Sequence, residues 1–231
     1  MMRIDIISAV PQLLDGPLAH SIVGKARDKD LVAIHIHDLR DYSENKHNKV
    51  DDYPYGGGAG MVLTPQPIFS CIEELLSQRD YDEIIFTAPD GLPFKQGHAN
   101  QLSVTKNLMF LCGHYKGVDQ RVRDTLITQE FSMGDYVLSG GELPAMTMVD
   151  AIVRLLPGAL GDAESALTDS FQHDLLEGPV YTRPAEFRGM EVPAVLRSGD
   201  HQKVDQWRLK QSLERTQKVR PDLYKKFRNE Q

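Results

Sequence analysis

The stretch Gly134-Asp135-Tyr136-Val137-Leu138-Ser139-Gly140-Gly141-Glu142-Leu143-Pro144-Ala145-Met146 combines the signals of a strand, a turn and a helix. Tyr136-Val137-Leu138 is a short β-prone run, typical of the end of a buried strand. Ser139-Gly140-Gly141 follows, and adjacent glycines allow positive φ and close approach of backbone. Glu142 then begins a helical pattern, with Pro144 in the first turn, where its missing N–H costs little. The stretch therefore predicts a glycine elbow between a strand and a buried helix, with or without a ligand at the elbow.

The remainder of the N-terminal two thirds alternates between apolar runs and amphipathic patterns. The runs predict strands over residues 3–8, 31–37, 83–88 and 108–111, and the patterns predict helices around 13–23, 68–76, 97–104 and 118–127. Such alternation favours an α/β fold with a mostly parallel sheet. Three successive strands are each followed by a glycine-bearing loop, at 87–91, 112–117 and 134–141. Ligands bind at the carboxyl ends of such strands, so we expect a pocket lined by backbone groups and suited to an adenine-like ring edge.

Composition excludes several classes of protein. With 231 residues the chain can form one large core or a larger and a smaller domain. Cys71 and Cys112 are too few for a disulfide framework or a metal cluster, so we interpret them as reduced thiols. His35 and His37 share one face of a predicted strand without a third ligand, so we interpret them as structural. The N-terminus does not resemble a signal peptide, and no apolar stretch approaches the roughly 20 residues that span a bilayer. We therefore expect a cytoplasmic protein with no membrane contact.

Charge divides the chain unevenly. Residues 1–170 contain 14 Lys and Arg against 24 Asp and Glu, a net charge of −10, whereas residues 171–231 contain 12 against 9, a net charge of +3. The small, polar segment 159–169 separates the two parts and has the composition of a mobile linker. We expect a domain at 1–158, this linker, and a small, mainly helical, basic domain at 170–231. The basic part would meet a polyanion first, although a solvated helix face would have the same charge pattern.

An ordered set of short motifs is similar to the bacterial tRNA (guanine-N1)-methyltransferases of the SPOUT class. Each motif alone is weak, whereas the set, in order over nearly the whole chain, is highly specific. Besides the stretch quoted first, the motifs are Tyr55-Gly56-Gly57-Gly58-Ala59-Gly60-Met61, Cys112-Gly113 with Tyr115 and Gly117, Asp169-Ser170-Phe171, Tyr181-Thr182-Arg183-Pro184, Val192-Pro193, Leu196, Ser198-Gly199, His201 and Trp207-Arg208.

The resemblance implies a fold and a cofactor that periodicity cannot give. The implied fold is a SPOUT-type, mostly parallel sheet whose three strand-end loops form a deep trefoil knot, followed by the helical C-terminal domain. It also implies a homodimer with each active site built across the interface. S-adenosylmethionine would bind in the knot. The implied cofactor-binding residues are Thr87, Ala88, Pro89, Gly113, Tyr115, Gly117, Met133, Gly134, Asp135, Tyr136, Val137, Leu138, Gly140, Gly141 and Pro144.

The resemblance assigns the chemistry to two residues. The product is a methyl group on N1 of the guanosine immediately 3′ of the anticodon in tRNA. N1 of neutral guanine carries a proton, and Asp169 is the implied general base that removes it. Arg154 is the implied partner of the charge that develops on O6. In isolation, Asp169 would be a cap or loop residue, and Arg154 would form an ordinary helical ion pair with Asp150.

The tRNA anticodon stem-loop is the implied partner. The residues implied to contact it are Gly57, Gly58, Ser170, Glu177, Lys203, Arg208, Lys210 and Arg215. Four positions depart from the family pattern: Lys116 stands where an acid is usual, Glu177 where Asp is usual, Val180 where His is common, and Asp90 follows Pro89 in place of Gln. These departures affect the fine contacts, not the reaction class. The resemblance admits a magnesium ion, but the sequence shows no cluster of metal ligands.

Two other functions stay open. A SPOUT methyltransferase acting on ribose 2′-OH or on another base would not need Asp169 as a base at N1. A catalytically silent RNA-binding protein would bind the cofactor without turnover, and the presence of both Asp169 and Arg154 argues against it.

Overall fold

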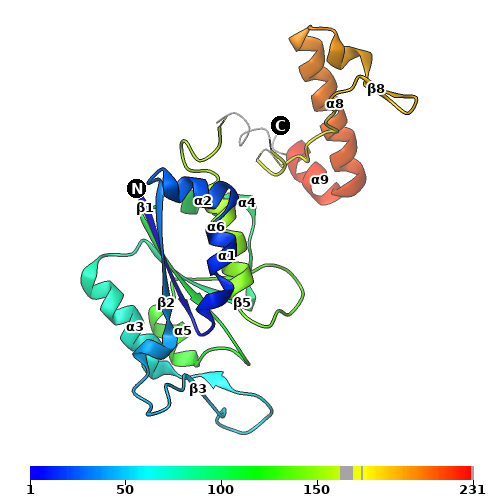
Figure 1. The fold of residues 1–231 in the computed structure, drawn as a ribbon. Helices are drawn as coiled ribbons and strands as arrows, with labels where there is room; N and C mark the ends of the chain where they lie inside the picture. Colours follow the sequence, from blue (N-terminus) through cyan, green and yellow to red (C-terminus); the bar gives the residue numbers. More distant parts are fainter. Residues whose placement is uncertain (162–168, 173, 230–231) are drawn as a thin grey trace. The chain divides into compact units, whose positions relative to one another are not determined.

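The structure is a computed structural model that describes residues 1–161, 169–172 and 174–229. It divides into two compact units, Met1–Ala163 and Glu164–Gln231, here called unit 1 and unit 2. Unit 1 contains a twisted sheet covered by helices, and unit 2 contains a short hairpin and two helices (Figure 1). None of the helices over the described ranges is long and apolar enough to cross a membrane. Most of the predicted linker lies outside the described residues.

Within the described residues, the main sheet of unit 1 has five strands, all paired in parallel. Their spatial order is β2 (Val32–Asp38), β1 (Met2–Ser8), β6 (Asn107–Cys112), β5 (Glu83–Pro93) and β7 (Gln129–Ser132). The predicted α/β class with a mostly parallel sheet is therefore confirmed. Since β6, β5 and β7 are neighbours, the loops that follow them meet at one edge.

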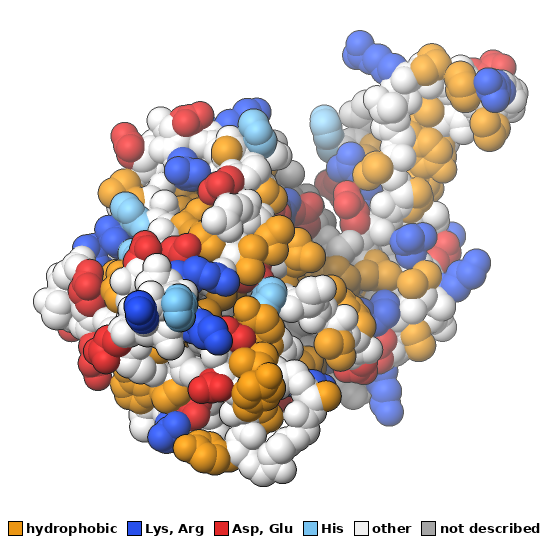
Figure 2. Space-filling model, turned by 60° about the horizontal axis from the view of Figure 1, so that its bottom comes forward, with side chains coloured by type: hydrophobic (Ala, Val, Ile, Leu, Met, Phe, Trp, Pro, Cys, Tyr) orange, Lys and Arg blue, Asp and Glu red, His pale blue; other side chains and the backbone are white. Residues whose placement is uncertain are grey.

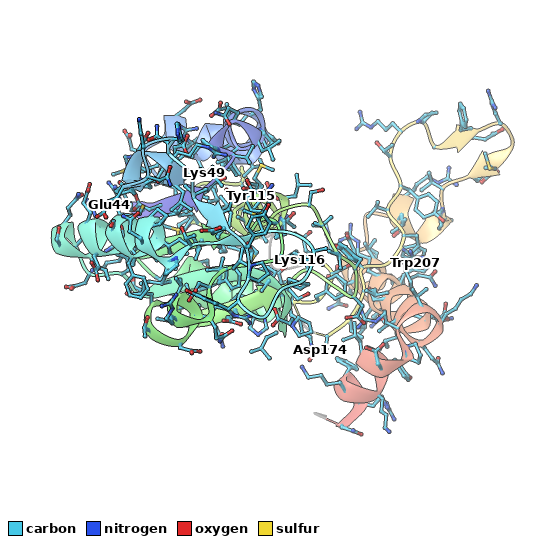
Figure 3. All side chains as sticks on the ribbon, turned by 90° about the horizontal axis from the view of Figure 1, so that it is seen from below. Glu44, Lys49, Tyr115, Lys116, Asp174 and Trp207 are labelled. Carbon is cyan, nitrogen blue, oxygen red and sulfur yellow. The ribbon has the colours of Figure 1, made fainter. Side chains whose placement is uncertain are left out.

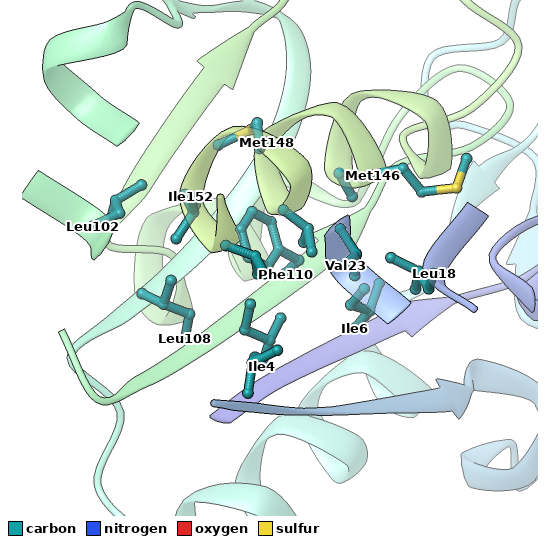
Figure 4. Packing of buried hydrophobic residues seen from close by; sticks show 14 of the residues in the cluster. Ile4, Ile6, Leu18, Val23, Leu102, Leu108, Phe110, Met146, Met148 and Ile152 are labelled. Carbon is teal, nitrogen blue, oxygen red and sulfur yellow. The ribbon is translucent and has the colours of Figure 1, made fainter. Parts of the chain in front are cut away.

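Helices cover both faces of this sheet, which is why apolar residues fill β6 and the first half of β5 almost without interruption. On one face, Ile6 and Phe110 pack under the helices α2 (Ser21–Asp28), α4 (Gln96–Ser103) and α6 (Glu142–Val153), as Figure 4 shows. On the other face, Ile7 and Leu111 pack under α3 (Pro65–Gln78) and α5 (Gln120–Leu126). Adjacent strand residues point to opposite faces, so each strand contributes to both cores.

Three expectations about local structure were wrong. The pattern around 13–23 gives three short pieces, η1 (Pro11–Leu13), α1 (Asp15–Leu18) and α2, instead of one helix. The turn expected at Pro89-Asp90-Gly91 is an irregularity inside β5, whose register against β7 shifts between Thr87 and Leu92. Tyr136-Val137-Leu138 does not end a strand, because β7 stops at Ser132 and all three side chains are exposed.

A buried polar cluster fixes the outer part of the sheet. The Asp5 side chain is fully buried and accepts hydrogen bonds from Arg3 (2.6 and 2.8 Å) and from the Tyr81 hydroxyl (2.8 Å), and it lies 2.7 Å from His37 Nε2. Burial raises the pKa of the Asp5 carboxyl, but the hydrogen bonds from His37, Arg3 and Tyr81 outweigh it and hold the pKa well below its usual range. His37 therefore has a structural contact, while His35 is exposed on the same strand.

Unit 2 is small and mainly helical. It contains the hairpin β8 (Glu186–Phe187) and β9 (Met190–Glu191), then α8 (His201–Val219) and α9 (Pro221–Asn229). Thr216 of α8 is fully buried, and its hydroxyl oxygen accepts a hydrogen bond from the Leu176 N–H at 2.8 Å. This bond attaches the segment that follows Asp169 to the long helix.

Candidate functional site

A pocket of about 320 Å³ opens beside the ends of β6 and β7 and the irregular part of β5. It is lined by Phe86, Thr87, Ala88, Pro89, Gly113, His114, Tyr115, Lys116, Gly117, Phe131, Ser132, Met133, Tyr136, Val137, Leu138, Ser139, Gly140, Gly141 and Pro144. All the residues expected to bind the cofactor are among them except Gly134 and Asp135. The three loops that the sequence singled out therefore form one cavity.

The glycine elbow is in close contact with the loop that follows β6. The Gly141 N–H donates to the Gly113 carbonyl at 2.7 Å, and the Thr87 hydroxyl donates to the Gly141 carbonyl at 3.2 Å. A β carbon on residue 141 would lie 2.6 Å from the backbone nitrogen of Gly113, closer than such atoms can approach. Glycine is therefore required at 141 for the backbone contact that closes this side of the pocket.

The irregular part of β5 supplies a second wall. Ala88 and Pro89 line the pocket, and the next residue, Asp90, accepts a hydrogen bond from Arg123 Nη2 at 2.9 Å. This bond lowers the pKa of the Asp90 carboxyl. Arg123 also donates to Glu130 of β7, so α5 fixes both strands. The departure from the family pattern at Asp90 thus has a local ionic partner in this chain.

The loop after β6 also supports the glycine-rich segment 56–60. The Lys116 N–H donates to the Met61 carbonyl at 2.9 Å, and a β carbon on Gly60 would touch the Lys116 side chain. Figure 3 shows Tyr115 and Lys116 among the loops gathered at this end of unit 1. Gly57 and Gly58, expected to contact substrate, are exposed at positive φ and do not line the pocket.

The segment after β7 presents apolar side chains to solvent. Gly134, at φ +140°, turns the chain after Ser132, and the Tyr136 ring packs against it. Val137 is 83% exposed and Tyr136 59% exposed, although both line the pocket. Figure 2 looks toward this end of unit 1 and shows hydrophobic side chains in patches among basic and histidine side chains. The β-prone run is thus a pocket rim and not part of the sheet.

A buried acid lies behind the elbow, and sequence reasoning assigned it no role. The Glu142 side chain is 1% exposed, and its Oε1 accepts a hydrogen bond from the Ser8 hydroxyl at 2.6 Å. Its Oε2 is 3.9 Å from Nδ1 of His114, and neither of these two atoms has a hydrogen-bond partner among the residues that the structure describes. The one signal in the sequence was an acid at the first position of a long buried helix.

Arg154 lies far from the pocket within its own chain. It caps the carboxyl end of α6, whereas the pocket is at the amino end of that helix. Glu142 and Arg154 are 12 positions apart in the sequence, and a rise of 1.5 Å per residue separates their backbones by about 18 Å. The structure therefore does not bring Arg154 to the pocket of its own unit.

Three of the other expected residues meet in unit 2. A depression of about 550 Å³ is lined by Asp169, Glu177 and Arg208, together with residues of 175–180 and α8. Ser170 uses its hydroxyl to accept a hydrogen bond from the Glu177 N–H at 2.9 Å, which orders the segment that carries Asp169. The chain thus gathers a carboxylate and a guanidinium at one concave surface of unit 2.

The basic residues of α8 are mostly paired within the helix. Lys203 lies 2.8 Å from Asp200, Arg208 lies 3.8 Å from Asp205, and Lys210 lies 3.8 Å from Glu214. These groups and Arg215 are exposed, and exposed pairs contribute only about 0–1 kcal/mol, so a polyanion can replace the acidic partners. Across the described parts of both units, no group of three or more His, Cys, Asp or Glu side chains is placed to hold a metal ion.

The similarity to known proteins extends over nearly the whole chain. A family model described as tRNA (Guanine-1)-methyltransferase TrmD matches residues 2–226. Proteins named tRNA (guanine-N(1)-)-methyltransferase align over 222 residues, which is 96% of this chain. The one from Bacteroides fragilis is 58% identical, with 99% of its length covered, and the one from Flavobacterium johnsoniae is 57% identical, with 98% covered. The one from Chlorobium luteolum is 56% identical, with 96% covered.

Proposed function

The chain belongs to the tRNA (guanine-N1)-methyltransferase family, and from this premise we propose how its residues perform the reaction. The chain is a methyltransferase acting on N1 of guanine in tRNA. In our proposal, the target is the guanosine immediately 3′ of the anticodon, and the methyl donor is S-adenosylmethionine. The observation that carries the proposal is the single pocket formed by the loops at 87–91, 112–117 and 134–141.

The residues of the pocket fit this donor. Its volume lies within the roughly 300–1,000 Å³ typical of small-molecule sites. Gly113, Gly140 and Gly141 line the pocket without side chains, so the edge of an adenine ring can approach the backbone there, and Leu138 and Pro144 offer apolar surface. When bound, S-adenosylmethionine supplies an electrophilic methyl group. The close contact between the elbow and the loop after β6 supports the proposal of a SPOUT-type knot in this unit.

Asp169 is the proposed general base. Guanine N1 carries a proton in the neutral base, so a carboxylate within hydrogen-bond reach must accept that proton before the nitrogen can act as a nucleophile. Asp169 shares its depression with Arg208, whose guanidinium supports the binding of a phosphate next to the target base. The negative charge that develops on O6 would be stabilised by the guanidinium of Arg154.

The length of α6 supports a site shared by two copies of the chain. Arg154 is about 18 Å along the helix from the elbow and cannot reach the pocket of its own unit without unfolding α6. A second copy of the chain can instead place its own Arg154 at this pocket. We therefore propose a homodimer in which one chain supplies the donor pocket and the other supplies Arg154 and Asp169. The basic domain 170–231 would hold the anticodon stem-loop.

Two tRNA transcripts that differ only at the base 3′ of the anticodon test this proposal. With labelled S-adenosylmethionine, the transcript with guanosine should gain label and the one with adenosine should not. Asp169→Asn should lower the rate by about 10²–10⁴-fold, the usual contribution of general acid–base catalysis. Asp222→Asn, which only breaks an exposed pair with Arg220, is the matched control.

Each other outcome points elsewhere. Label in both transcripts would refute the assigned base, and a 2′-O-methylated product would indicate another reaction on the same fold. Tight binding of S-adenosylmethionine without any transfer would indicate an RNA-binding protein without catalysis.

A further inference from the structure

Behind the elbow, a buried carboxylate and an imidazole face each other without being joined. Glu142 Oε2 and His114 Nδ1 are 3.9 Å apart, and both atoms are buried without a hydrogen-bond partner in the described parts of the chain. A buried polar atom without a partner costs free energy, and a buried charge costs more. A structure that keeps two such atoms opposite each other is poised to join them.

The surrounding bonds leave His114 as the donor for this oxygen. The Ser8 hydroxyl accepts from the Val10 N–H at 2.8 Å, so its only proton goes to Glu142 Oε1. The oxygen of a carboxylate can only accept, and therefore His114 must carry a proton on Nδ1 to bond it.

The two groups lie on two of the segments that enclose the pocket, the loop after β6 and the start of α6. His114 follows β6 and lines the pocket, and its ring packs edge-on against the Tyr115 ring at 4.7 Å. Glu142 begins α6 directly after the elbow. Between them lies Gly140, whose missing side chain leaves the gap open: a β carbon there would lie 2.6 Å from His114 Nδ1. A shortening of about 1 Å would bring the pair to the usual charge-assisted hydrogen-bond distance.

From this geometry we infer that His114 and Glu142 are a positioning pair. Their side chains form a hydrogen bond with each other when S-adenosylmethionine fills the pocket. The backbone of the loop 112–117 is already bonded to the elbow through Gly141 and Gly113, so the new bond forms by a movement of the His114 ring, which packs against the Tyr115 ring at the rim. The complex with S-adenosylmethionine is thereby stabilised by a buried hydrogen bond that the free protein lacks. This inference rests on the proposed S-adenosylmethionine site.

The test compares two substitutions at position 114. Asn places an amide nitrogen close to where Nδ1 lies, whereas Leu has a similar size and cannot donate. A buried hydrogen bond to a charged group corresponds to about 10- to 100-fold in an equilibrium constant. His114→Leu should therefore weaken the binding of S-adenosylhomocysteine by about that factor and raise the KM for S-adenosylmethionine more than it lowers kcat. His114→Asn should restore most of the affinity.

Nitrogen-15 spectra of histidine-labelled protein provide a second measurement, made on the wild-type protein and assigned with one variant. On addition of S-adenosylhomocysteine to the wild-type protein, one Nδ1-bound proton should become protected from exchange with water. Its assignment follows from its absence in His114→Asn. In Glu142→Gln, whose amide can donate toward the ring, the proton should move to Nε2 of His114.

Equal affinities of the wild-type and His114→Leu proteins would overturn the inference, as would equal losses in the Leu and Asn variants or an unprotected Nδ1. In these cases the wild-type protein still binds S-adenosylhomocysteine and the proposed function stands. Failure of the wild-type protein to bind would overturn both.

Discussion

Substitution of Gly141 by alanine should separate the two loops of the pocket. The added β carbon would lie 2.6 Å from the Gly113 nitrogen and 2.9 Å from the Cys112 Cα, and these backbone atoms cannot rotate away. Overpacking of this kind costs about 1–3 kcal/mol. Displacement also weakens the hydrogen bonds that Gly141 makes with Gly113 and Thr87, each worth about 0.5–1.5 kcal/mol. We expect the free energy of unfolding of unit 1 to fall by about 2–4 kcal/mol.

Urea unfolding followed by far-ultraviolet circular dichroism measures this loss through the helices and sheet of unit 1, since the only tryptophan, Trp207, belongs to unit 2. Calorimetric titration with S-adenosylhomocysteine should show affinity reduced by at least about tenfold, since 1.4 kcal/mol is enough for that factor. Gly97→Ala is the matched control: no heavy atom lies within 4 Å of its β carbon, and in α4 the change should stabilise by about 0.5–1 kcal/mol. Wild-type stability and affinity in Gly141→Ala would refute the reasoning.

Three further outcomes follow from the structure. The folded-state pKa of Asp5 is lowered, so the carboxylate contributes fully to the free energy of unfolding above the unfolded pKa of about 3.9, and this contribution is lost as pH falls below that value. Asp5→Asn should therefore lower the free energy of unfolding at pH 7 and flatten its dependence on pH below about 4. Urea titrations at several pH values measure both effects. Thr216→Val leaves the buried Leu176 N–H unpaired and should destabilise unit 2 by about 1–3 kcal/mol, measured by Trp207 fluorescence, and an unchanged transition would contradict this account. Arg208→Ala should weaken tRNA binding and reduce the slope of log K against log salt by about 1, and an unchanged slope would show that Arg208 meets no phosphate.

Local sequence signals were sufficient to predict most elements of unit 1. The buried strands are rich in apolar residues, and the start of α6 follows from two glycines, an acid and an early proline. The grouping of three loops followed from a general property of parallel sheets. The predictions went wrong where apolar character does not mean burial: Tyr136 and Val137 have strand-like side chains but lie at a pocket rim, where apolar groups can remain exposed.

Long-range relations were not predictable from the sequence. Nothing local indicates that Pro89-Asp90-Gly91 stays inside β5, because a turn and a bulge use the same residues and Arg123, which holds Asp90, is 33 positions away. The opposition of His114 and Glu142 depends on which loops become neighbours in the sheet. The resemblance named Asp169 and Arg154, but only the structure shows that α6 holds Arg154 away from the pocket of its own chain.

The distance along α6 also bears on how defects combine in a cell. A chain altered at Gly141 loses the pocket at the amino end of α6, and a chain altered at Arg154 loses the guanidinium at the carboxyl end. With the two-copy site proposed above, a mixed pair draws an intact pocket from the second chain and an intact arginine from the first. Two alleles that are each defective alone should therefore complement each other, and a cell carrying both should retain methylated tRNA.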